Sequence, residues 1–223
     1  MAKIGLVYTS TTPELTLLVE QEVKKQLGAD TAMLTYTDPS ILAEVRDHGY
    51  VTCNAASRLI TMFLKAAQDG ADAVLNICSS VGEVADCAQD VARFIGVPIV
   101  RIDEEMCRDA VRQGSRIGVL ATLPTTLEPT KNTIRRVARE MGRQVTLVDG
   151  LVDAFGLDQE QFKNLLIGKA LEICKDVDVI LLCQGSMAYC EQLIADACKK
   201  PAVSSPRYGA AALKEALISK GTI

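Results

Sequence analysis

The sequence predicts an α/β protein of two pseudo-symmetric lobes, each a parallel sheet flanked by helices. Strand and helix patterns alternate along the chain, which is typical of parallel sheets covered by helices. The segment 3–13 returns in similar form at 116–126, and two apolar runs, 73–80 and 179–186, each reach a cysteine followed by small polar residues. Ligands of open α/β sheets sit at the carboxyl ends of the strands, so we expect the active site in the cleft between the lobes.

Eight strands are expected, each a short apolar run bounded by polar or turn-forming residues. They lie near residues 3–9, 30–36, 72–78, 98–102, 116–122, 144–149, 178–183 and 201–204. The segments between them read as helices. In the first helix, Thr12 and Pro13 are typical of the N-cap and first helical residue, and Gly28 ends the apolar stripe. A second helix is expected over about 52–68, ended by Gly70.

Both copies of the repeat have the same order of elements. Each runs strand, helix, strand, helix, cysteine-ended strand, helix, and a short strand that opens at Pro98 or Pro201. A helix from 103 leads into the second copy, and its counterpart at 206–220 is expected to pack back on the first. We therefore predict a discontinuous lobe of residues 1–102 with 206–223, and a second lobe of residues 103–205.

The composition is that of an ordinary globular protein, with 48% hydrophobic and 23% charged residues. Lys and Arg number 24 against 28 Asp and Glu, without a long basic run, so we expect no nucleic-acid partner. No apolar stretch approaches the 18 residues of a membrane span, and the first residues enter a strand pattern without a signal-peptide core. We expect a cytoplasmic protein without a membrane partner. Scarce aromatic residues and the absence of Trp argue against a flavin.

The chain has eight cysteines, no C-x-x-C and a single histidine, His48, so zinc-ligand spacing is missing and no metal site is expected. Free thiols are expected in place of disulfides. Most are expected to be small core residues, and His48 to be a solvated or capping residue at the end of a short helix. Cys78 and Cys183 differ from the others because each ends a buried strand in one copy of the repeat.

Two thiols suit a reaction that takes a proton from a stereocentre and returns one to the opposite face. One cysteine acts as thiolate and the other as thiol, and they exchange roles with each turnover. A free thiol has a pKa of about 8.5, so one of the two needs help toward the thiolate, and the helix starts after Cys78 and Cys183 are candidate sources.

Candidate substrate-binding residues surround these cysteines. Hydroxyls that follow the first and fifth strands have the chemistry to bind a carboxylate, although helix capping is an equally good interpretation. Further candidates are residues beside the thiols and at the start of the second helix, and Arg207 is a weaker one. The set is Ser10, Thr11, Thr12, Asn54, Ser79, Ser80, Thr122, Thr125, Gln184 and Gly185, with Thr126 as a neighbour.

Four segments together, 76–82, 121–126, 182–187 and 201–207, resemble the aspartate/glutamate racemase superfamily, which includes hydantoin racemases, arylmalonate decarboxylases and maleate isomerases. The resemblance spans nearly the whole chain. It implies two pseudo-symmetric lobes, a reaction without a cofactor, Cys78 and Cys183 as the catalytic thiols, and a homo-oligomer. Glutamate racemases carry Asn-Thr and Thr-His directly after the cysteines, whereas this chain has Ser79-Ser80 and Gln184-Gly185.

The expected function is a cofactor-independent racemase or epimerase of a small amino acid or related carboxylate, using two-thiol proton transfer at the α-carbon. Three alternatives remain open: a maleate-type cis–trans isomerase, an arylmalonate-decarboxylase-like lyase, and a two-lobed protein that binds a metabolite without turning it over.

Overall fold

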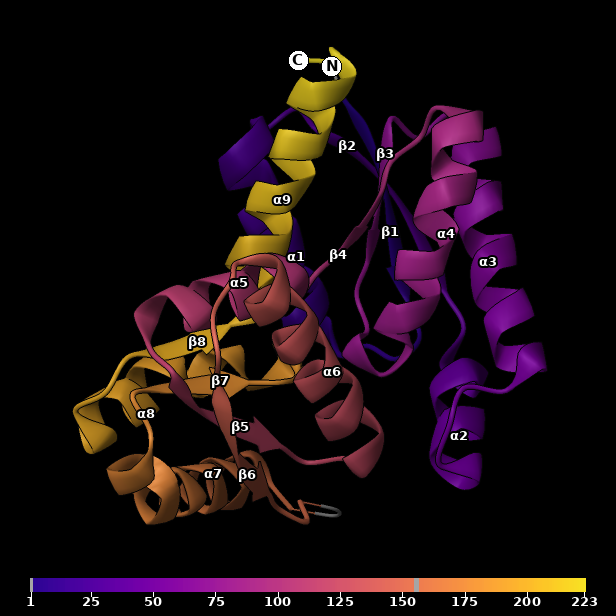
Figure 1. Ribbon diagram of the computed structural model, residues 1–223. Coiled ribbons are helices and arrows are strands. Elements are labelled where there is room, and N and C mark those ends of the chain that lie inside the picture. The colour runs from indigo at the N-terminus through magenta and orange to yellow at the C-terminus, as the bar shows by residue number, and fades with distance from the viewer. Residues whose placement is uncertain (1, 155–156) are drawn as a thin grey trace. The chain divides into compact units, whose positions relative to one another are not determined.

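The computed structural model describes residues 2–154 and 157–223 (Figure 1). The chain divides into two units, Met1–Ile102 with Pro206–Ile223, and Asp103–Ser205, here called unit 1 and unit 2. Each contains a four-stranded, wholly parallel sheet, with strand order β2-β1-β3-β4 in unit 1 and β6-β5-β7-β8 in unit 2. Since β5 to β8 repeat the order of β1 to β4, the predicted α/β architecture of two lobes with like topology is confirmed.

Unit 1 buries both faces of its sheet under helices. Its elements are β1 (Lys3–Tyr8), α1 (Pro13–Leu27), β2 (Ala32–Thr37), α2 (Pro39–His48), α3 (Cys53–Gln68), β3 (Ala73–Asn76), α4 (Gly82–Ile95), β4 (Ile99–Arg101) and α9 (Ser205–Lys220). Residues of α2, α3 and α4 form one apolar cluster with alternate strand residues, and residues of α1 and α9 form another with the remaining ones (Figure 1). Strands buried on both faces give continuous apolar runs, which explains the pattern seen in the sequence.

Unit 2 is built in the same way. Its elements are α5 (Glu104–Gln113), β5 (Arg116–Ala121), α6 (Pro124–Glu140), β6 (Thr146–Leu151), α7 (Gln159–Ile173), β7 (Val179–Leu182), α8 (Glu191–Cys198) and β8 (Ala202–Ser204). Helices α7 and α8 share a core cluster with Leu120, Ile180 and Leu182. Helices α5 and α6 pack on each other and on β5 and β7, which accounts for the opposite face.

All eight predicted strands are present, but one is displaced. The sequence predicted a strand at 144–149, whereas β6 is Thr146–Leu151. Asp149 and Gly150 disfavour strands locally, yet they pair with Val119 and Leu120 of β5. The Leu120 side chain packs directly against Gly150, because a Cβ added to this glycine would lie 2.7 Å from Leu120 Cδ1. Pairing with the neighbouring strand therefore overrides the local preference.

The helix ends follow the predicted capping in unit 1. The Thr12 hydroxyl accepts a hydrogen bond from the Leu15 N–H (3.3 Å), Pro13 begins α1, and Gly28 ends it at a φ of +105°. The helix expected directly after Cys183 is different. A 3-10 helix (Gly185–Cys190) comes first, and α8 begins only at Glu191. The N-terminus of α8 is therefore not the source of thiolate stabilisation proposed for Cys183.

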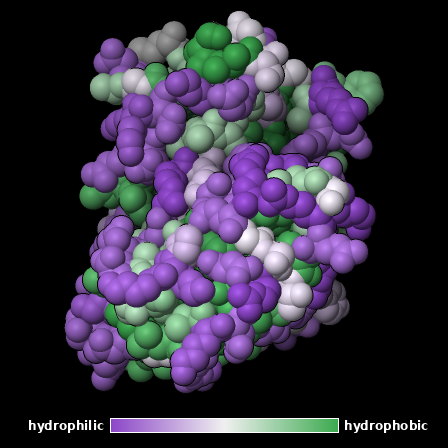
Figure 2. All heavy atoms as spheres, turned by 60° about the vertical axis from the view of Figure 1, so that its left-hand side comes forward, coloured by the Kyte–Doolittle hydropathy of each residue, from purple (hydrophilic) through white to green (hydrophobic). Residues whose placement is uncertain are grey.

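Hydrophilic side chains predominate on the face drawn in Figure 2, with apolar ones scattered between them. This distribution fits helices that bury one stripe against a sheet and expose the rest. Within the described ranges, no helix is long and apolar enough to cross a membrane.

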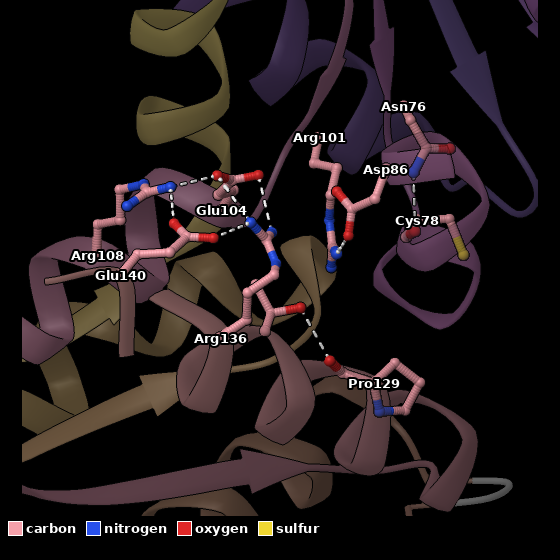
Figure 3. A network of polar contacts seen from close by, with 10 residues as sticks. Asn76, Cys78, Asp86, Arg101, Glu104, Arg108, Pro129, Arg136 and Glu140 are labelled. Carbon is pink, nitrogen blue, oxygen red and sulfur yellow. Dashed lines mark hydrogen bonds and ion pairs between the residues drawn. The ribbon is translucent and has the colours of Figure 1, made fainter. Parts of the chain in front are cut away.

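Two arginines and two glutamates tie α5 to α6 (Figure 3). Arg108 Nη2 lies 2.8 Å from Glu104 and 2.6 Å from Glu140, and Arg136 lies 3.0 Å from each of the same carboxylates. Burial tends to raise the pKa of Glu104, but the hydrogen bonds from Arg136 and Arg108 outweigh burial and lower that pKa. The same balance lowers the pKa of Glu140. Four charges in one network stabilise more than isolated surface pairs.

We predict that Glu104→Gln removes part of the acid sensitivity of folding. A carboxyl whose folded pKa is lowered stabilises the fold above its unfolded pKa of about 4.3, and that contribution is lost as the pH falls through the folded pKa. Urea unfolding at pH 7 should therefore show the variant about 1 kcal/mol less stable than the parent, with the gap closing below about pH 4. Glu160→Gln, at the exposed pair with Lys163, is the control and should leave the curve unchanged. An unchanged gap at low pH would contradict the assignment.

Candidate functional site

The two cysteine-ended strands lie at matching places in the two sheets. In unit 1, β1 is between β2 and β3, so the chain leaves β1 toward one side of the sheet and later returns on the other. Such a switch point opens a crevice at the carboxyl ends of the two central strands, where α/β proteins bind ligands. Cys78 follows β3 and the hydroxyl loop 9–12 follows β1; Cys183 follows β7, and residues 122–126, which include the start of α6, follow β5. We call these places the β1–β3 edge and the β5–β7 edge.

The two cysteines are offset by one residue within this common scheme. Val7 pairs with Asn76 in unit 1, and its repeat equivalent Leu120 pairs with Leu182 in unit 2. The next residues bond alike: the Ile77 N–H donates to the Val7 carbonyl and the Cys183 N–H to the Leu120 carbonyl, both at 2.9 Å. Cys183 is thus equivalent to Ile77, the residue before Cys78. The inference that the two cysteines occupy equivalent positions at the strand ends is therefore wrong by one residue.

This offset changes the direction of each side chain, because neighbouring residues of a strand point to opposite faces. Cys78 packs against the apolar cluster of α2, α3 and α4, whereas Ile77 belongs to the cluster of α1 and α9. Cys183 lies on the face covered by α5 and α6, opposite to that of Leu182. The two thiols are therefore not related by the internal repeat.

Cys78 is partly exposed and sits on a turn held by its neighbours (Figure 3). The Asn76 side-chain amide donates to the Cys78 carbonyl oxygen (3.1 Å), which fixes the chain as it leaves β3. Ser79 and Ser80 follow in a buried 3-10 turn, and α4 begins at Gly82. Backbone N–H groups of the turn and of the first turn of α4 are of the kind that bind anions.

A buried arginine fixes the start of α4. The Arg101 side chain, at the end of β4, is fully buried and forms an ion pair with Asp86 of α4 (2.6 Å). Its guanidinium lies so close to Gly82 that an added Cβ there would be 2.4 Å from Arg101 Nη2. Gly82 has ordinary helical dihedrals, so this contact explains the glycine, and backbone strain does not. Arg101 was not expected from the sequence, where a polar residue ending a short strand carries no distinct signal.

Cys183 is buried in polar surroundings, unlike a cysteine of an apolar core. The polar groups that act on its thiol are the Thr130 hydroxyl of α6 and the carboxylates of Asp103 and Asp149. Burial is the main cause that raises the pKa of the Cys183 thiol to about 12; the Thr130 hydroxyl lowers it and the two carboxylates raise it. Cys183 is therefore a protonated thiol at neutral pH.

Gln184 and Thr122 lock the β5–β7 edge together. The Thr122 N–H donates to Gln184 Oε1 (3.0 Å), and Gln184 Nε2 donates to the Thr122 hydroxyl (2.6 Å). The two loops are joined across 62 residues of sequence by this pair. Both residues were predicted to bind substrate. Their mutual hydrogen bonds hold the segment after Cys183 beside the segment after β5. Gly185, the next residue, is half-buried at the start of the 3-10 helix.

Buried polar atoms without a hydrogen-bond partner gather at these edges. Among the described residues, such atoms include the Thr9 hydroxyl and Asn76 Oδ1 in unit 1, and the hydroxyls of Thr125 and Ser205 in unit 2. Thr9 and Ser205 directly follow strands, Asn76 ends β3, and Thr125 lies in the first turn of α6, the helix after β5. An unsatisfied buried group costs roughly 1–3 kcal/mol, so a ligand or ordered water is the expected partner. Thr125 was predicted; Thr9, Asn76 and Ser205 were missed, although each is a polar residue that ends an apolar run.

The other predicted residues have local roles. Thr12 caps α1, and the Thr11 hydroxyl pairs with that of Thr16 (2.7 Å), while Ser10 is exposed beside them. Asn54, in the first turn of α3, donates to Glu44 of α2 (2.9 Å), which ties it to a surface cluster. Of the weaker candidates, His48 Nδ1 contacts the Glu44 carbonyl oxygen, Thr126 is buried in the first turn of α6, and Arg207 stacks on Tyr208.

The described part of the chain contains no candidate metal site and no disulfide. No group of three or more His, Cys, Asp or Glu side chains is placed to hold a metal ion there. All eight cysteines fall within the described ranges, and none is in a disulfide.

These features define an α/β protein of two repeated parallel-sheet units, with a cysteine at the switch point of each. The chain belongs to the Asp/Glu/hydantoin racemase family, which it matches over residues 4–213. No curated protein sequence matches it significantly.

Solved structures share the fold at low sequence identity. Glutamate racemase from Bacillus anthracis superposes with a TM-score of 0.74 at 17% identity, covering 99% of this chain and 83% of its own. Allantoin racemase from Klebsiella pneumoniae gives 0.69 at 18% identity, covering 99% and 89%. A variant of arylmalonate decarboxylase gives 0.61 at 14% identity, covering 98% and 93%.

Proposed function

We propose that this protein is a cofactor-independent racemase or epimerase of a small amino acid or related carboxylate, with Cys78 and Cys183 as its acid/base pair. The observation that supports it best is the thiol at the switch point of each sheet in a chain of a racemase family. The proposal requires both thiols to act on one substrate carbon from opposite faces. Within the described residues, neither thiol belongs to a disulfide or to a cluster of metal-binding side chains.

In the proposed reaction, one thiolate removes the α-proton and the other thiol supplies a proton to the opposite face of the same carbon. The electron pair left by the broken C–H bond delocalises into the adjacent carbonyl and then forms the new C–H bond. One proton is taken and one is given, so the enzyme finishes with thiol and thiolate exchanged. Since burial raises the pKa of the Cys183 thiol, we assign Cys183 the role of acid and Cys78 the role of base in the half-reaction that starts from this state.

Substrate binding falls to the polar atoms at the two edges. The buried oxygens of Thr9 and Thr125, together with N–H groups of Ser79 and Ser80, offer the hydrogen bonds that a carboxylate and its α-substituent need. Ser10, Thr11 and Thr12, with Gly185 beside Gln184, extend these edges as proposed binding residues. Thr122 and Gln184 support them through their mutual hydrogen bonds. Asn54 is the weakest of the proposed binding residues because it pairs with Glu44.

The test is proton exchange in deuterated water with both enantiomers of candidate amino acids, hydantoins and allantoin. Racemisation through this mechanism predicts that the product enantiomer carries deuterium at the α-carbon while the unreacted enantiomer stays largely protiated at early times. This pattern arises because the donated proton comes from a solvent-equilibrated thiol. Tight binding without exchange for all candidates would instead indicate a metabolite-binding protein.

A single-thiol reaction is the second candidate, either arylmalonate decarboxylation or maleate-type isomerisation. The observation that favours it is the inequivalence of the thiols: Cys183 is buried with a pKa raised to about 12, and Cys78 is partly exposed. This candidate would replace the racemase proposal if the protein released CO2 from a disubstituted malonate or converted maleate to fumarate. One of the two cysteines should then be replaceable by alanine without loss of that activity.

A further inference from the structure

Helix α4 presents its larger apolar side chains to solvent. The residues that it buries are small: Gly82, Ala85, Ala88 and Ala92. Val91, Phe94 and Ile95 are instead 46%, 93% and 37% exposed, and Cys87 is exposed as well. A surface helix ordinarily has the opposite distribution, with its large apolar side chains on the face that packs against the core. A second apolar surface is therefore left uncovered on this helix.

The outward residues form one continuous stripe. Cys87, Val91 and Phe94 follow one another at intervals of four and three residues, which places them on the same side of a helix. Helix α3 packs beside α4 (Figure 1), and the sheet covers the alanine face, so the stripe lies on the remaining, outer side. Apolar residues scattered singly on a surface need no explanation, whereas a contiguous patch is typical of a protein–protein contact.

The charges on one flank of the stripe fit a second copy of the same helix. Asp90 and Arg93 lie one turn apart, each with a side chain that is 80% exposed, and they form an ion pair at 3.2 Å. A two-fold axis brings the same patch of both copies together. If the two helices run antiparallel, Asp90 of each copy lies level with Arg93 of the other. The two ion pairs within the helices can then be exchanged for two ion pairs between them.

The same register accommodates the exposed aromatic ring. When Asp90 is level with Arg93 of the second copy, Phe94 is level with Gln89 of that copy and lies between its Cys87 and Val91. Side chains of packed helices interdigitate in this way. The symmetry repeats the contact, so both rings are covered at once. Charge and side-chain position therefore favour one and the same arrangement.

We propose that the outer side of α4 is the contact surface of a homodimer, in which two copies of the helix pack antiparallel across a two-fold axis. A parallel pair would instead place Asp90 opposite Asp90 and Arg93 opposite Arg93, which is repulsive. One pair of helices is a small interface, so we expect a dissociation constant in the micromolar range. This proposal is independent of the reaction proposed for the two cysteines.

The first test is the molecular mass of the full chain by sedimentation velocity over micromolar concentrations. Phe94→Asp should have half the mass of the parent wherever the parent is associated, because a charge replaces the ring at the centre of the contact. Leu171→Asp is the matched control: Leu171 is a 45% exposed leucine of α7, and its replacement should keep the parent mass. Urea unfolding should show that both variants are folded. A parent that is monomeric throughout, or a Phe94→Asp variant with the parent mass, would overturn the proposal.

The second test uses the symmetry of the charges. Asp90→Arg makes both facing positions positive and Arg93→Asp makes both negative, so each variant alone should associate roughly 10- to 100-fold more weakly than the parent. A mixture of the two variants should associate again, because one copy then supplies two arginines and the other two aspartates. The pair is exposed, so neither change should alter the unfolding curve of the monomer.

A control for the charge changes is Lys163→Asp, which reverses a charge in the exposed i,i+3 pair with Glu160 on α7 and should keep the parent mass. Association of the mixture alone, with each variant by itself monomeric, is specific to the antiparallel two-fold register. Variants that remain dimeric by themselves, or a mixture that stays monomeric while the parent dimerises, would refute this arrangement.

Discussion

Replacing Cys183 by alanine should lower the rate of racemisation by roughly 10²- to 10⁴-fold, the range that one positioned acid or base contributes. Cys78→Ala should do the same. Each variant removes the proton donor or acceptor on one face of the substrate carbon, so conversion between enantiomers stops even though substrate still binds. The rates follow from circular dichroism or chiral chromatography on the substrate identified by deuterium exchange.

The two variants should fail in complementary ways. With Cys78 alone, the α-proton of one enantiomer can still be taken and returned on the same face, so that enantiomer exchanges slowly with deuterium and keeps its configuration. With Cys183 alone, the other enantiomer should do so. Cys190→Ala is the matched control, since Cys190 is a buried cysteine of unit 2 that belongs to the apolar core cluster. Full activity in both catalytic variants, or exchange of the same enantiomer by both, would contradict the mechanism.

Gly82→Ala should destabilise the protein by about 1–3 kcal/mol, a large effect for one methyl group in a helix. The new Cβ would lie 2.4 Å from Arg101 Nη2 and 2.5 Å from Cζ, so the fully buried guanidinium must move to make room for it. Such overpacking strains the buried ion pair between Arg101 and Asp86. Domain stabilities of about 5–15 kcal/mol make such a loss visible in any unfolding curve.

A second glycine gives the control with the opposite sign. Gly168 lies in α7, and an added Cβ there would meet nothing within 4 Å. Gly168→Ala should stabilise the protein by about 0.5–1 kcal/mol through its helix propensity. In the Gly82→Ala background, Arg101→Met should recover part of the lost stability by relieving the contact. Equal effects of the two glycine substitutions, measured by chemical denaturation, would exclude the proposed packing of Arg101.

Much of the fold was predictable because the buried parallel strands produce apolar runs that stand out between amphipathic helices. The errors occurred where tertiary pairing overrides local preference. Asp149 and Gly150 end a strand by composition, yet both pair with β5. After Cys183, the six-residue 3-10 helix replaced the α-helix that the pattern predicted. The one-residue offset between Cys78 and Cys183 was hidden because it is set by pairing register, which a run of apolar letters does not specify.

The candidate site was predictable in its cysteines and only partly in its surroundings. Thr125 stood out as a hydroxyl after a strand, and its buried, unpartnered oxygen agrees with a binding role. Arg101 could not be found, because its importance comes from its contacts with Gly82 and Asp86 on another element. An arginine at a strand end is ordinary in the linear pattern.

The contribution of α9 to unit 1 affects the order in which the chain can fold during synthesis. Ala210, Leu213 and Leu217 complete the cluster on one face of the first sheet, which otherwise has only α1 to cover it. Residues 103–205 are translated before these three. Unit 2 therefore has all its elements while unit 1 still lacks α9, one of the two helices that cover this face of its sheet. Although nascent chains usually fold from the amino-terminal end, here the middle segment is the first that can reach its mature packing on the ribosome.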